Sequence, residues 1–224
     1  MKRLYAIITL LSIQFCLFGQ ETQILDKKER DEQAVFNILN LEKGIMVFQL
    51  KTQAKKMAEL ERLINSPDVT EKSKQRLRKE KLDEETIRKK FNDDLIAGIQ
   101  SNYKFSDYMI IYDVDAKFLE ENPSKIQIIK SSKPALDLSN SFYLLVKESW
   151  TNGSGLEALI VHDQFQVPLQ QPFPYYYKIN SIDRLFWSLF SSKTYYRKSA
   201  DKITKKLNSA LYKFKDRIVL RINE

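Results

Sequence analysis

The stretch Ser141–Gln164, SFYLLVKESWTNGSGLEALIVHDQ, decides the predicted fold of this chain. Two apolar runs, Phe142–Val146 and Leu156–Val161, flank Thr151–Gly155, which contains Asn-Gly. Such runs on either side of Asn and Gly are typical of the two strands of a hairpin, because Asn-Gly tolerates the positive φ angles of a tight turn. Alternate residues of the first run are apolar on both sides. We therefore expect this pair at the centre of a sheet that is covered on both faces.

Other segments are predicted to complete the sheet. Tyr108–Val114 is a predicted strand, and Ile126–Ile129 is a short one. Ile45–Leu50 is short and β-prone and follows Gly44, which ends a helix predicted over Asp31–Lys43. A strand at Ile45–Leu50 is favoured over continuation of that helix. The result is a mixed sheet of four or five strands.

A helical hairpin is predicted between two of these strands, over about residues 52–100. Thr52–Asn65 has apolar residues at helical spacing, and Ser66-Pro67 breaks that pattern. Asp68 and Glu71 match a capping box that would start the second helix. The first part of this helix is rich in Lys and Arg, and its end is apolar at a spacing of four. We therefore expect a basic helical hairpin that projects from the domain, with its last turns packed on the core.

The region after the central hairpin combines aromatic residues with a long helix. Phe165–Tyr177 has three prolines within seven residues and is predicted to be an extended crossover. Ser181–Phe190 is a predicted short helix. Tyr195–Val219 has apolar residues at spacings of three and four, with lysines mainly elsewhere. This pattern indicates a helix packed on the core or a basic amphipathic helix on a membrane surface.

These elements predict one mature α+β domain, residues 20–224, in which helices pack on the mixed sheet. The alternative is a three-layer α/β domain. It is favoured if Ile45–Leu50 pairs in parallel with Tyr108–Val114 across the helical crossover.

The N-terminus predicts export. Lys2–Arg3 form a charged start, Leu4–Phe18 is mostly apolar, and a small residue follows, so residues 1–19 are interpreted as a signal peptide. An uncleaved anchor is the alternative. The only cysteine, Cys16, lies in this segment, so the mature chain has none for disulfides, thiolate ligands or nucleophiles. We expect a periplasmic or secreted protein without a transmembrane segment in its mature chain.

The charge of the chain bears on its partners. The formal net charge is +8, from 37 basic and 29 acidic residues. This excess is consistent with binding to an anionic surface or polymer, and it is also consistent with a soluble basic surface that has no anionic partner. The expected partner is an envelope protein or an anionic surface. Specific nucleic-acid binding is not expected, because no recognition motif is present.

Catalytic motifs of the common kinds are missing from the sequence. The five glycines form no phosphate-binding loop, and no Gly-x-Ser-x-Gly elbow occurs. His162 is the only histidine, and Asp113 and Asp115 lie two residues apart. These three residues support at most a metal-independent hydrolase. The favoured interpretation is a non-catalytic exported binding or envelope-associated protein with no cofactor and no metal. Peripheral binding to an anionic surface or polymer is the second alternative.

Aromatic residues near the end of the crossover form the best candidate ligand site. Their rings could stack on a sugar, a base or a partner's side chain. The alternative is that they fill the end of the sheet beneath the C-terminal helix. The candidate residues are Phe173, Tyr175, Tyr176, Tyr177 and Trp187.

A resemblance to a known group of proteins rests on short motifs spread over most of the mature chain. Gly44–Leu50, Tyr108–Tyr112, Phe142–Val146, Leu156–Asp163 and above all Pro172–Tyr176 look like those of uncharacterised secreted proteins of Gram-negative bacteria. The resemblance implies export and a shared fold. It implies no catalytic residues.

Overall fold

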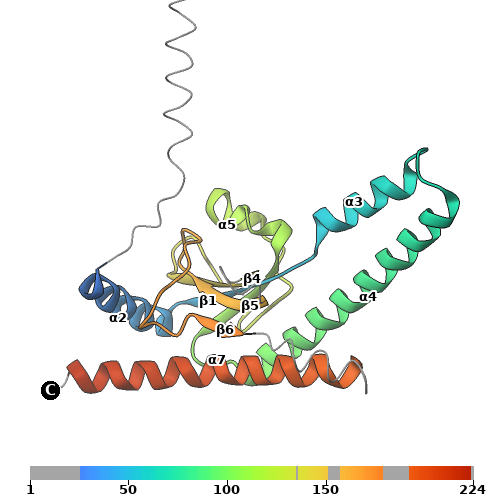
Figure 1. Ribbon diagram of the computed structural model, residues 1–224. Helices are drawn as coiled ribbons and strands as arrows, with labels where there is room; N and C mark the ends of the chain where they lie inside the picture. The colour runs from blue at the N-terminus through green and yellow to red at the C-terminus, as the bar shows by residue number, and fades with distance from the viewer. Residues whose placement is uncertain (1–25, 135, 151–156, 179–191, 223–224) are drawn as a thin grey trace, which may run out of the picture.

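The computed structural model describes residues 26–134, 136–150, 157–178 and 192–222 (Figure 1). Four predictions lie outside these residues. They concern the signal peptide at 1–19, the turn at 151–155, the helix at 181–190 and the position of Trp187.

The fold is α+β, with a mixed sheet of six strands where four or five were predicted. The strand order is β3-β2-β1-β4-β5-β6. The additional strand, β6, pairs with β5 at the edge of the sheet, where the neighbouring prolines are tolerated. The strands are β1 (Ile45–Leu50), β2 (Asp107–Tyr112), β3 (Lys130–Ser131), β4 (Tyr143–Trp150), β5 (Glu157–His162) and β6 (Tyr176–Lys178).

The predicted hairpin is confirmed and lies beside the central strand. β4 and β5 are antiparallel, with Val146 opposite Val161. Leu144 and Val146 face one side of the sheet, and Tyr143 and Leu145 face the other, as the alternation predicted. On its other edge β4 pairs in parallel with β1, which is also confirmed as a strand.

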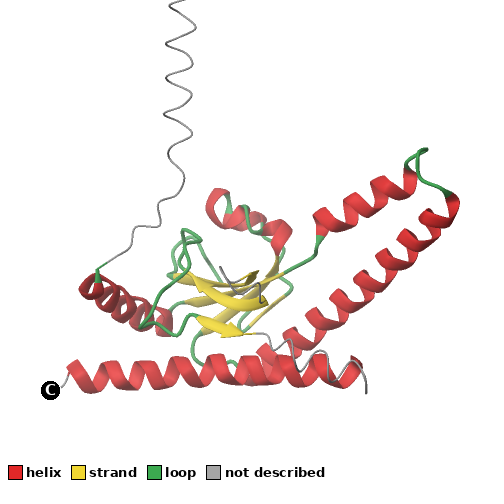
Figure 2. Cartoon of the chain, viewed as in Figure 1, coloured by secondary structure: helices red, strands yellow, loops and turns green. Residues whose placement is uncertain are grey.

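β1 and β2 pair in parallel, which is the pairing that would favour the three-layer α/β alternative. The placement of the helices nevertheless differs from that of a three-layer domain. The helices α2 (Lys27–Lys43) and α7 (Ser192–Ile222) and the end of α4 (Glu71–Asn102) all pack on one face. The opposite face carries the four-residue helix α5 (Phe118–Glu121) and the adjoining loops (Figures 1 and 2). The long helices therefore form one layer.

Two predicted boundaries are wrong around β2 and β3. β2 ends at Tyr112, and Asp113–Asp115 forms the 3₁₀ turn η1 instead of continuing the strand. Ile126–Ile129 follows the 3₁₀ turn η2 (Pro123–Lys125) and is not a strand. Pairing with β2 begins only where the Ile129 amide donates to the Ile110 carbonyl, at 2.8 Å.

The start of α2 also differs from the prediction, which placed it at Asp31. Asp26 is the N-cap, and its side chain accepts from the Glu29 amide at 2.8 Å. The Glu29 carboxylate accepts in turn from the Asp26 amide at 3.0 Å. This capping box satisfies two amides at the helix end and adds one turn to the helix.

The helical hairpin projects from the sheet as predicted, in the form of α3 (Ala54–Asn65) and α4 (Figure 1). Thr70, not Asp68, caps α4, because its side chain lies next to the first helical residues and accepts from the Ser73 amide. The hairpin is nearly neutral, since residues 54–102 hold twelve basic and ten acidic residues. The prediction of a basic hairpin therefore describes the first turns of α4 and not the whole hairpin.

The C-terminal helix α7 packs on the core, so the interpretation as a core helix is confirmed. Ala200, Ile203, Leu207, Leu211 and Phe214 are all buried against the sheet and α4. Gly98 of α4 allows the two helices to approach closely, because a Cβ there would lie 3.2 Å from the Ala200 carbonyl. No helix in the described ranges has the length and apolarity needed to cross a bilayer.

Candidate functional site

A cleft of about 630 Å³ lies where the start of α2, the end of α7 and the Gln171–Tyr176 segment meet. Its walls come from three parts of the chain that are distant in the sequence. The segment contributes prolines and aromatic rings, and the two helices contribute charged side chains. The lining residues are Lys27, Arg30, Asp31, Gln171, Pro172, Phe173, Pro174, Tyr175, Tyr176 and Arg217.

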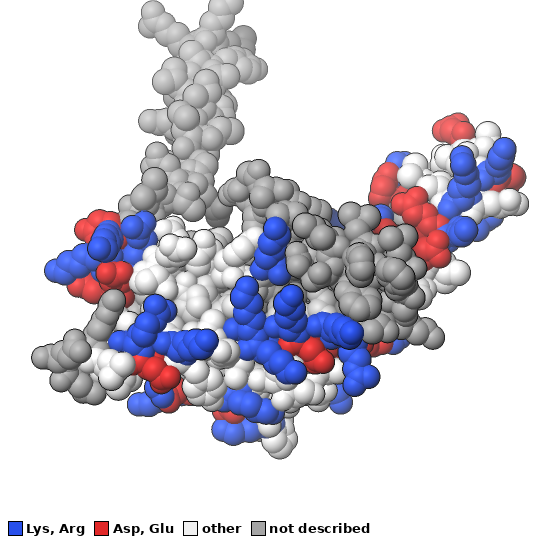
Figure 3. Space-filling view, turned by 60° about the horizontal axis from the view of Figure 1, so that its bottom comes forward, with Lys and Arg blue, Asp and Glu red and all other residues white. Residues whose placement is uncertain are grey.

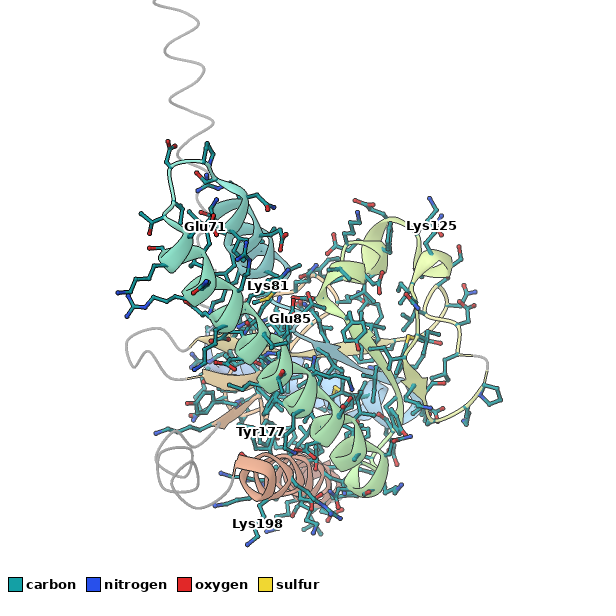
Figure 4. The ribbon with its side chains drawn as sticks, turned by 90° about the vertical axis from the view of Figure 1, so that its right-hand side faces the viewer. Glu71, Lys81, Glu85, Lys125, Tyr177 and Lys198 are labelled. Carbon is teal, nitrogen blue, oxygen red and sulfur yellow. The ribbon has the colours of Figure 1, made fainter. Side chains whose placement is uncertain are left out.

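The structure divides the predicted aromatic cluster into two roles. Phe173 is 2% exposed and packs edge-on against Phe214 of α7, with ring centroids 5.8 Å apart. Tyr177 is buried between the sheet and α7 (Figure 4), and its hydroxyl donates to the Pro174 carbonyl at 2.7 Å. Burial raises the pKa of the Tyr177 phenol, so it remains protonated. These two rings belong to the core, as the alternative interpretation proposed.

The other two described rings face the cleft. Tyr175 and Tyr176 have ring centroids 6.3 Å apart, and the side chain of Tyr176 is 36% exposed. With Pro172 and Pro174 they form an apolar wall that is open to solvent. Rings and proline faces of this kind give a ligand a surface on which to stack.

The cations of the cleft were missed by sequence reasoning. Lys27 and Arg30 lie one turn apart on α2, and Arg217 lies on α7 above the Phe214 ring, 5.6 Å from its centroid. Asp31 is the one acidic residue in the lining, so the cleft carries an excess of positive charge. The start of α2 and the end of α7 meet only in the folded chain, and no local motif links them.

A second polar cluster lies at the carboxyl ends of the parallel strands. Arg88 of α4 donates through Nη1 to both carboxylate oxygens of Glu148 on β4, at 2.7 and 3.0 Å. Asn92 donates from Nδ2 to the Lys51 carbonyl at 3.1 Å, at the end of β1. A hollow of about 300 Å³ adjoins Arg88 and Asn92. This cluster ties the base of the hairpin to the sheet.

Asp113 lies at the same edge and has a structural role. Its Oδ1 accepts from the Thr52 amide at 3.0 Å and from the Thr52 hydroxyl at 2.6 Å. These bonds hold the chain as it leaves β1 and enters the left-handed residue Gln53, where φ is 59°. The carboxylate therefore orders the start of the hairpin.

His162 lies far from this edge. Its side chain is 3% exposed, and Nδ1 lies 3.0 Å from the Ile160 carbonyl. Burial, aided by the charge of Lys147, lowers the pKa of His162 to about 4. The register places three strand spacings, roughly 14 Å, between β5 and β2, in addition to an offset along the strands. Asp113, Asp115 and His162 therefore do not converge on one pocket.

In the part of the chain that the structure describes, no three His, Cys, Asp or Glu side chains gather in a way that could hold an ion.

In comparisons with known proteins, the chain matches no protein-family model, no curated protein and no solved structure.

Proposed function

We propose that this chain is an exported, non-catalytic binding protein that holds a small anionic ligand with a ring or an apolar body in the α2–α7 cleft. The observation that carries the proposal is the meeting of three cations with an aromatic and proline wall in one cavity. The volume of about 630 Å³ lies within the range of small-molecule sites.

The two walls suit two parts of such a ligand. Lys27, Arg30 and Arg217 would bind a carboxylate, sulfate or phosphate group, because charge-assisted hydrogen bonds to anions are the stronger ones. The Tyr175 and Tyr176 rings would contact its body. The separation of Asp113 from His162 supports a binding role over the hydrolase alternative.

Matched probes test this proposal. We would titrate benzoate against benzyl alcohol, and glucuronate against glucose, and follow the backbone NMR signals of the cleft residues. The anionic member of at least one pair is expected to bind more tightly. Replacement of Arg30 and Arg217 by Gln should weaken its binding by about tenfold or more. The matched control replaces Arg76 and Arg78, which are exposed on α4, and should leave binding unchanged.

Three results would count against the cleft as an anion site. They are equal shifts with the neutral and anionic probes, an equal loss in both double variants, and no shifts at all. Only the first leaves a binding function, since it would indicate recognition through the rings alone.

Export is a separate part of the proposal and rests on residues 1–19 and on the resemblance to secreted proteins of Gram-negative bacteria. Fractionation of the host into cytoplasm, periplasm, membranes and medium tests it. A shortened chain in the periplasm or medium is expected. A full-length cytoplasmic chain would contradict export and would leave the cleft proposal untouched.

A further inference from the structure

Helix α7 carries a charge equal to the net charge of the whole chain. The helix contains ten basic and two acidic residues, which leaves +8, the same as the formal charge of the whole chain. All other residues together are therefore neutral. Figure 3 shows Lys and Arg side chains gathered over this helix, with few acidic side chains among them.

Five lysines of α7 follow one side of the helix. Lys198, Lys202, Lys205, Lys206 and Lys213 are exposed and recur mainly at spacings of three and four. The buried residues Ile203, Leu207 and Leu211 occupy the opposite side. In Figure 4, Lys198 points away from the sheet. This lysine stripe, Lys198–Lys213, is about 22 Å long at 1.5 Å per residue.

The hairpin provides the contrast, because it is nearly neutral and several of its lysines pair with carboxylates across the two helices. Lys56 pairs with Glu80 and Glu84 across the two helices, and Lys81 pairs with Glu61. On α7, Lys205, Lys206 and Lys213 have no such carboxylate partner among the residues that the structure describes. An external anion would compensate these three positive charges.

The shape of this face indicates the kind of anion. α7 runs straight along the base of the molecule (Figure 1). Past the stripe the same helix exposes Val219 and Leu220, the latter 65% exposed. A straight row of lysines that ends in exposed aliphatic side chains matches a plane of phosphate headgroups with acyl chains beneath it. The main apolar face is already used by the core, so contact would be at the headgroups without insertion of the helix.

We infer that the lysine stripe of α7 docks the protein on a surface of anionic lipid headgroups. This surface lies outside the α2–α7 cleft, and the inference does not depend on the proposed ligand there. It places the contact with an anionic surface on α7 and not on the hairpin.

Vesicle sedimentation tests the inference. The probes are vesicles of phosphatidylglycerol and phosphatidylcholine at a ratio of about 3 to 7, and vesicles of phosphatidylcholine alone. The protein is expected to sediment with the anionic vesicles, to be released by salt, and to stay in solution with the neutral ones. Replacement of Lys205, Lys206 and Lys213 by Gln should lower the partition coefficient by about tenfold or more.

The matched control replaces Lys55, Lys72 and Lys79 of the hairpin by Gln. All three are exposed, so the control loses the same charge from a different place. The inference holds if the control partitions like the wild type. An equal loss in both variants would show attraction by net charge alone and would overturn it. Release of the protein by a sub-stoichiometric soluble polyphosphate would also overturn it, in favour of a linear polyanion. Failure of the protein to bind anionic vesicles at low salt would overturn the inference as well.

Discussion

Loss of the Arg88 side chain is expected to destabilise the fold although the residue lies on the projecting helix. The Glu148 side chain is 2% exposed, and that of Arg88 is 14% exposed. Replacement of Arg88 by Met removes the guanidinium whose Nη1 donates to both oxygens of a carboxylate that water does not reach. Breaking a buried ion pair in this way costs about 3–5 kcal/mol, because the remaining charge stays desolvated. We expect that loss in the free energy of unfolding at neutral pH.

The measurement is urea unfolding followed by far-UV circular dichroism, with three comparison variants. Arg88→Met combined with Glu148→Leu removes both charges and should lie within about 1 kcal/mol of the wild type. Lys89→Met removes the exposed partner of Asp93 and should leave the stability close to that of the wild type, because solvent screens an exposed pair of this kind. Glu148→Gln tests the carboxylate itself.

Two results would count against this reasoning. A loss below about 1 kcal/mol for Arg88→Met at neutral pH would refute the argument. So would a double variant as unstable as the single one.

Three further predictions concern other parts of the molecule. Because burial lowers the pKa of His162 from 6.5 to about 4, the free energy of unfolding should fall by roughly 3 kcal/mol as the pH drops through that window. It should be unaffected by His162 above pH 6.5, and His162→Gln should flatten the acid slope in urea titrations at several pH values. Phe173→Ala should cost about 3–5 kcal/mol in the same assay, whereas Tyr176→Ala should leave stability nearly unchanged and weaken ligand binding. Gly98→Val should cost about 1–3 kcal/mol and lower the melting temperature, because the new side chain would meet the Ala200 backbone.

The candidate site was only half predictable. Tyr175 and Tyr176 were found because aromatic residues beside prolines stand out in any sequence. Lys27, Arg30 and Arg217 were not, since a cation on a helix looks the same whether it faces water or a cleft. The prediction that Phe173 binds a ligand competed with a role in the core, and only its contact with Phe214 decides for the core.

Local patterns were enough to locate most elements of the fold. Three patterns depend only on residues that are close together in the sequence. They are the alternation in Phe142–Val146, the helix break at Ser66-Pro67 and the apolar stripe of α7. The errors fell where two local preferences compete. Asp68 and Thr70 are both good caps, and the Thr70 side chain is the one that accepts from the Ser73 amide.

The amino-acid sequence alone therefore specifies most of the secondary structure, the net charge and the absence of the common catalytic motifs, because each of these depends on composition or on neighbours along the chain. It favours the α+β class over the three-layer alternative. The tertiary structure alone decides the parallel centre of the sheet, the Arg88–Glu148 pair and the cleft between α2 and α7. It also decides which hairpin charges form pairs across the two helices, since Lys56 meets Glu84, and Lys81 meets Glu61, only when α3 and α4 pack together. Burial of apolar surface brings together residues that lie far apart in the sequence, and the local sequence around each residue does not indicate its distant partner.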